Sequence, residues 1–200
     1  MNIDELRLSV LNKKKNRKEN IKNIFKQSSF RDASILAKWF LPSQSYGEVL
    51  NSWFRAKYNW KKNSSENREG DDRVFDTYNV EVKASLCDDG KTCHYVQIRL
   101  THNIDFYFLP TYNFETDKTH FILLNKKQMK ELIEQHGGYA HGTKSEKGNI
   151  CDNIDNVDIE YALRPNIKSK SSSLWKTLQS FEIKEEEINE IEVWKKREKE

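Results

Sequence analysis

Two acidic segments in the middle of the chain are spaced so that one β-hairpin would bring them together. Gly70-Asp71-Asp72 comes shortly before Asn79-Val80-Glu81-Val82-Lys83. Because successive side chains of a strand point to opposite faces, the two valines are expected to enter a core while Glu81 and Lys83 point together out of it. Two carboxylates can hold Mg²⁺, and an ammonium group beside them can orient or deprotonate water and stabilise charge on a phosphate. The pattern therefore predicts a metal-dependent phosphodiesterase site.

The hairpin interpretation competes with a simpler one. A Glu-x-Lys pair on a strand is often an exposed ion pair worth about 0–1 kcal/mol. The acids upstream favour the metal-site interpretation. Asp71 or Asp72 can begin a first strand over 73–75, and residues 76–79 favour a turn. A second strand over 80–85 would then return beside the first. The sequence alone leaves open which aspartate lies beside Glu81.

These residues resemble the PD-(D/E)xK nuclease signature, and the whole chain resembles a small type II restriction endonuclease of that superfamily. The family places an aspartate at the start of its second core strand and the Glu-x-Lys on its third. The resemblance implies that Asp71 or Asp72 binds Mg²⁺ together with Glu81, and that Lys83 positions and activates the attacking water. Asp71 fits the pattern better, and Gly70 stands where the family name has proline.

The resemblance also implies a substrate and partners. The substrate is double-stranded DNA, cut at a short specific site, and a cognate DNA methyltransferase is expected in the same system. A homodimer is expected because a two-fold axis presents the same residues to both strands of a palindrome. Two alternatives remain: a structure-specific repair or junction nuclease with the same fold, and a non-catalytic DNA-binding protein in which Glu81 and Lys83 form a surface pair.

Two further polar residues are candidates for the catalytic site. Glu48 lies on a helix expected over 43–58, where family members often have an additional acid, although a glutamate in a first turn is also favoured by the helix dipole. Residues 95–100 alternate strictly, so Gln97 and Arg99 are expected on one polar face bordering the hairpin. Gln97 is a candidate to assist catalysis, and Arg99 a candidate to contact DNA.

Two loops are candidates for DNA contact. In the glycine-punctuated segment 138–144, Thr143 and Lys144 can bind phosphate and His141 can approach a base edge. A turn with only local hydrogen bonds would have the same composition. In a second loop, Arg164 and Asn166 have side chains shaped for bidentate contacts to guanine and adenine. Solvated loops of this composition are also common.

The composition and the distribution of charge predict the domain organisation. A chain of 200 residues with 32% charged residues and a mean hydropathy of −0.90 suits one domain, over 1–200. Residues 7–26 carry eight basic side chains against one acid, which predicts a basic helical arm over 1–27 that lies along phosphates or is simply solvated. Residues 182–200 predict a charged C-terminal helix.

Cysteine usage and hydropathy predict a cytoplasmic protein of a prokaryote. The three cysteines, an odd number, indicate free thiols in a reducing compartment, and their spacing fits no common zinc site. No run approaches the roughly 18 to 20 apolar residues of a membrane span, and the first residues do not resemble a secretory signal.

The remaining pattern predicts an α/β (α+β) fold in which helices flank a central mixed β-sheet, as in a restriction-endonuclease core. A further helix is expected over 28–41, and another between Asn125 and Gly137. Two strands, 104–112 and 119–124, are expected to form a hairpin, with Pro110 marking an edge or a bend.

Overall fold

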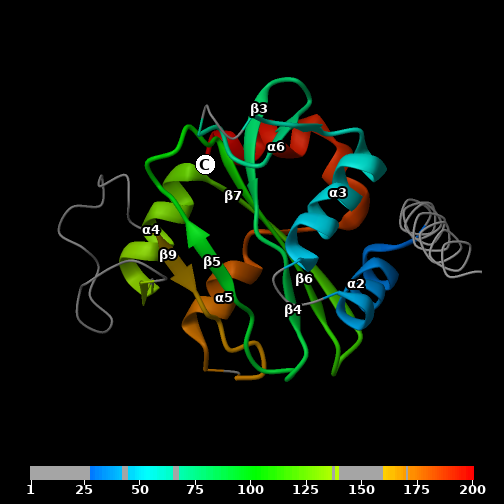
Figure 1. The fold of residues 1–200 in the computed structure, drawn as a ribbon. Helices are drawn as coiled ribbons and strands as arrows, with labels where there is room; N and C mark the ends of the chain where they lie inside the picture. Colours follow the sequence, from blue (N-terminus) through cyan, green and yellow to red (C-terminus); the bar gives the residue numbers. More distant parts are fainter. Residues whose placement is uncertain (1–27, 42–44, 65–67, 137, 140–159, 170) are drawn as a thin grey trace, which may run out of the picture.

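The computed structural model describes residues 28–41, 45–64, 68–136, 138–139, 160–169 and 171–200. It confirms the expected fold class, because a mixed β-sheet lies between two layers that contain helices (Figure 1). The basic arm expected over 1–27 lies outside the described residues. No helix in the described ranges has the length and apolar character needed to cross a membrane.

The larger sheet has seven strands in the order β1-β2-β3-β6-β7-β10, with β4 also pairing with β6. β3 and β4 run parallel to β6 one after the other, whereas the other neighbours are antiparallel. A second sheet joins three strands in the order β5-β9-β8. The strands are β1 Lys61–Lys62, β2 Asp72–Val74, β3 Tyr78–Val82, β4 Ser85–Cys87, β5 Tyr95–Ile98, β6 Phe106–Asn113, β7 Lys118–Asn125, β8 Gly138–Tyr139, β9 Tyr161–Leu163 and β10 Glu182–Ile183.

The two faces of the larger sheet pack against different elements. β6 shows this alternation, since Phe106 and Phe108 enter one core while Tyr107 and Leu109 enter the other. The first core contains residues of α2, α3 and α6, and the second contains residues of α4, α5 and the smaller sheet. The helices are α2 Phe30–Phe40, α3 Tyr46–Tyr58, α4 Lys126–His136, α5 Ser173–Gln179 and α6 Ile191–Glu198, with a 3₁₀ helix, η2, at Glu185–Asn189.

Two of the expected helices begin at side-chain caps. The Ser29 hydroxyl accepts a hydrogen bond from the backbone N–H of Asp32 at 3.1 Å, at the start of α2. At α4, Asn125 accepts from the backbone N–H of Gln128 at 2.8 Å, and the Gln128 side chain accepts from the N–H of Asn125 at 3.0 Å. This reciprocal pair is the capping-box geometry, and it fixes the point where β7 turns into α4.

Pro110 lies in a central strand, so the expected edge is wrong. It lies inside β6, paired with Phe121 of β7. On the other side of β6, β3 pairs as far as Phe108 and β4 starts at Thr111. Pro110 therefore falls in the gap between these two parallel partners, where a missing N–H leaves the ladder intact.

The segments over 80–85 and 182–200 also differ from expectation. The strand expected over 80–85 divides into the end of β3 and the start of β4, with Lys83 and Ala84 between them. The expected C-terminal helix is instead β10, η2 and α6, because Glu182 and Ile183 pair with the edge of β7. Charge and spacing alone did not reveal this edge.

Candidate metal and phosphodiester site

The hairpin of β2 and β3 separates the two aspartates. Asp72 pairs with Val80 across the antiparallel ladder, so both side chains lie on the same face of the sheet. Asp71 precedes β2 by one residue and therefore comes beside Glu81. The Asp71 carboxylate accepts a hydrogen bond from the backbone N–H of Val82 at 3.0 Å, which holds it at this position.

Glu81 and Lys83 form a close ion pair at the end of β3. Lys83 Nζ lies 2.5 Å from Glu81 Oε1, and the side chains are 17% and 5% exposed. Burial raises the pKa of Glu81; the Lys83 ammonium opposes this rise, and the Asp71 carboxylate adds to it. The two carboxylates thus repel each other electrostatically, which is the condition under which a divalent cation is attracted to a site.

Gly70 is required by the approach of the chain to β3. Its φ is +77°, a conformation that residues with a side chain rarely adopt. A Cβ added there would lie 2.8 Å from the carbonyl oxygen of Val80 and 2.9 Å from its carbon. Proline fixes φ near −65°, so the proline of the family name could not occupy this position.

Asp72 takes part in a separate network on the face covered by α3. Its fully buried carboxylate accepts from Nε of Arg55, and Arg55 Nη1 donates to Glu48 at 3.0 Å. Lys62 Nζ also lies 3.0 Å from Glu48. Burial raises the pKa of Asp72 to about 7, although the Arg55 guanidinium lowers it. Asp72 and Glu48 are therefore joined to each other through Arg55.

This network changes the interpretation of Glu48. The hydrogen bonds of Glu48 go to Arg55 and Lys62, and its side chain is 56% exposed. Its connection to the hairpin runs through Asp72, on the face away from Glu81. The structure thus does not bring Glu48 into the group formed by Asp71 and Glu81.

Tyr107 and Arg99 complete the surroundings of Glu81. Tyr107 pairs with Glu81 in the parallel register of β3 and β6, and burial and the Glu81 charge both raise its pKa. The Tyr107 hydroxyl donates to the carbonyl of Arg99 at 3.0 Å. Arg99 forms an ion pair with Glu160, and its charge also lowers the pKa of Glu81. Arg99 thus borders the hairpin, as the sequence predicts.

Gln97 lies at an irregular position of β5. The strict alternation over 95–100 is broken, because the register of β5 against β9 shifts between Tyr95 and Ile98. Gln97 has a φ of 58° and is exposed, while Tyr95 and Ile98 are both buried. An irregularity of this kind re-aims side chains, and the strict alternation fails at Val96, which is exposed beside the buried Tyr95; from Gln97 onward the buried Ile98 and Leu100 alternate with Gln97 and Arg99 as expected.

The proposed DNA-contact loops are only partly described. His141, Thr143 and Lys144 lie outside the described residues. Arg164 is exposed, whereas the Asn166 side chain accepts from the backbone N–H groups of residues 168 and 169, both at 3.1 Å. Asn166 therefore stabilises its own turn, and its amide oxygen is engaged there.

Several residues near the hairpin have no signal in the sequence. Arg55, Tyr107 and His102 come from a helix, a neighbouring strand and a turn, and no spacing rule links them to Glu81. Arg55 reaches the hairpin from α3, through its contact with Asp72, whereas Tyr107 and His102 come close because β6 pairs in parallel with β3. Of these residues, only Tyr107 could have been placed from the sequence, because the alternation of side chains along β6 puts it on the face opposite to that of Phe106 and Phe108.

The carboxylates present fit a magnesium ion better than zinc. Asp71 and Glu81 supply hard oxygen atoms, and Mg²⁺ is usually held by one or two carboxylates, with water and substrate phosphate filling its other positions. Within the described residues, no group of three or more His, Cys, Asp or Glu side chains is arranged to hold a metal. In the same part of the chain, Cys87 and Cys93 are buried free thiols.

No protein-family model matches this sequence, and no curated protein is significantly similar to it.

Proposed function

We propose that the protein is a Mg²⁺-dependent endonuclease that hydrolyses phosphodiester bonds of double-stranded DNA at a specific short site, in the manner of a type II restriction enzyme. The observation that carries this proposal is the group formed by Asp71, Glu81 and Lys83 at the end of one hairpin. A buried carboxylate, a second carboxylate beside it and an ammonium group 2.5 Å from the first are a suitable set for phosphoryl chemistry.

Each residue has a defined role in this proposal. Asp71 and Glu81 would hold the magnesium ion, which when bound polarises the phosphate and neutralises its charge. Lys83 is held by Glu81 and positions the attacking water for in-line approach to phosphorus. The water oxygen forms the new bond to phosphorus, the bond to one ester oxygen breaks, and that oxygen receives the proton released by the water.

The proposal extends to the biological context. The protein would act as a homodimer on a palindromic site, in the cytoplasm of a prokaryote, with a DNA methyltransferase that protects the same site. A homodimer suits a palindromic site, because its two-fold axis would present Asp71, Glu81 and Lys83 to both strands.

Digestion of plasmid DNA in Mg²⁺ tests the proposal. Discrete bands are expected from the wild-type protein, and none from Glu81→Gln or Lys83→Ala, each checked for native folding by circular dichroism. A smear, or a preference for branched DNA, would replace sequence specificity with structure specificity. Binding without any cleavage in Mg²⁺ or Mn²⁺, or full activity in either variant, would overturn the catalytic assignment.

A further inference from the structure

The positive charges of four side chains act on His102, in the turn between β5 and β6. Burial is the largest cause that lowers the pKa of this imidazole, and the charges of Arg99, Arg68, Lys83 and Lys126 lower it further. These side chains come from four segments of the chain that are distant in sequence. The His102 cluster, defined as His102 with these four residues, shares Lys83 and Arg99 with the surroundings of Glu81.

Hydrogen bonds to backbone carbonyl oxygens hold the His102 turn in place. Lys126 Nζ donates to the carbonyl of His102 at 2.7 Å, and the N–H of Asn103 donates to the carbonyl of Arg68 at 2.8 Å. Asn103 also accepts, through its carbonyl, from the Asn79 side chain at 3.1 Å. The turn is therefore tied to α4, to the segment before Gly70 and to β3.

Two of the four cations in the His102 cluster are paired with carboxylates. Lys83 is paired with Glu81, and Arg99 is paired with Glu160. Arg68 and Lys126 are exposed, and neither forms an ion pair with any residue in the described ranges. Cations that are close together and lack carboxylate partners create a positive potential that attracts an anion.

We propose that Arg68, His102 and Lys126 bind the phosphodiester group of duplex DNA that adjoins the bond positioned at Asp71 and Glu81. This inference rests on the proposed function, since the cluster is continuous with that site through Lys83. Arginine offers planar bidentate hydrogen bonds to phosphate and lysine offers a compact charge. The neutral His102 ring adds one N–H donor.

The salt dependence of DNA binding tests the inference without requiring cleavage. Affinity for a 30-base-pair duplex is measured by fluorescence anisotropy in EDTA, between about 50 and 200 mM salt. The logarithm of the association constant falls linearly with the logarithm of the salt concentration, and each lost phosphate contact reduces the magnitude of this slope by about 0.9. Arg68→Ala and Lys126→Ala are each expected to lower it by about 1, and the double variant by about 2.

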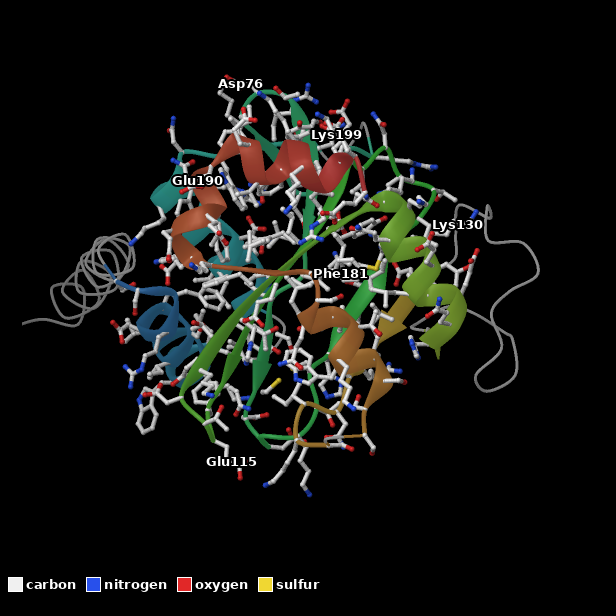
Figure 2. All side chains as sticks on the ribbon, turned by 180° about the vertical axis from the view of Figure 1, so that it is seen from behind. Asp76, Glu115, Lys130, Phe181, Glu190 and Lys199 are labelled. Carbon is white, nitrogen blue, oxygen red and sulfur yellow. The ribbon has the colours of Figure 1, made fainter. Side chains whose placement is uncertain are left out.

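Matched variants separate charge from structure. Arg68→Lys and Lys126→Arg keep the charges and are expected to keep the wild-type slope. Lys118→Ala removes an exposed charge at the start of β7, beside the β6–β7 turn that Glu115 marks in Figure 2, and is also expected to keep it. A wild-type slope in the double variant, or no binding of the wild-type protein at 50 mM salt, would overturn the inference.

Cleavage by Glu81→Gln, measured in parallel, distinguishes a failure of the proposed phosphate site from a failure of the proposed catalytic site. Loss of cleavage in that variant together with an unchanged slope in the double variant overturns the phosphate site alone. Retained cleavage in Glu81→Gln together with a reduced slope overturns the catalytic site alone and supports the phosphate site.

Discussion

The Asp71 carboxylate accepts a hydrogen bond from the backbone N–H of Val82, at 3.0 Å. This bond connects the segment that enters the hairpin to the residue between Glu81 and Lys83. A carboxylate has about four acceptor sites, so one N–H leaves capacity for a cation. The bond thus holds Asp71 next to Glu81 without consuming its ability to bind a metal.

The first prediction separates the two aspartates. Asp71→Asn keeps an oxygen that can accept from Val82 but removes the charge, and is expected to lower cleavage by about 100-fold or more, equivalent to about 2.7 kcal/mol. Asp72→Asn keeps an acceptor for Arg55 and is expected to lower it by less than about 10-fold. Initial rates on plasmid DNA measure both variants, and the reverse order would assign the site to Asp72.

The second prediction concerns magnesium binding. A cation that binds only the folded protein raises the free energy of unfolding by RT ln(1 + [L]/Kd). Added Mg²⁺ is therefore expected to raise the melting temperature of the wild-type protein above its value in EDTA, with no such rise in the double variant of Asp71→Asn and Glu81→Gln. Differential scanning fluorimetry without DNA measures this, and equal shifts in both proteins would contradict the site.

The third prediction concerns Gly70. Gly70→Ala places a side chain at a φ of +77° and within 2.8 Å of the Val80 carbonyl, so it is expected to lower the free energy of unfolding by about 2 kcal/mol or more. Gly47→Ala is the matched control, because it lies in α3 with nothing within 4 Å of the added carbon. It is expected to stabilise by about 0.4–1 kcal/mol. Urea unfolding measures both, and equal effects would refute the close approach.

The fourth prediction uses the titration of Asp72. Its pKa is raised from 3.8 to about 7 on folding, so the folded state keeps a proton that the unfolded state releases. The contribution of this group to the free energy of unfolding therefore falls as pH rises from about 4 to about 7, and is constant above.

Asp72→Asn removes this titration while leaving the other carboxylates in place. The free energy of unfolding of the variant minus that of the wild-type protein is expected to increase by about 1–3 kcal/mol between pH 4.5 and pH 7.5, at about 1.4 kcal/mol per pKa unit. Urea unfolding in EDTA at both values measures the difference. A difference that is constant with pH would show that Arg55 cancels the effect of burial, and a difference that decreases would show that Arg55 outweighs it.

The sequence predicted the elements whose signals are local. The alternation of Val80 and Val82 predicted their burial, and α2 and α4 lie within the helix ranges expected over 28–41 and between Asn125 and Gly137. Side-chain period and the signals that bound a helix depend on neighbouring residues, so one sequence is enough to read them.

Tertiary structure decided everything that depends on pairing between distant segments. The register of Asp72 with Val80 placed Asp71 beside Glu81, and the network through Arg55 kept Glu48 away from that pair. The approach of the His102 turn to Lys83 and Lys126 was equally hidden, as was the place of Pro110 inside a central strand. Strand register and crossovers are fixed by packing on two faces of one sheet, and a shift of a single residue would exchange those faces.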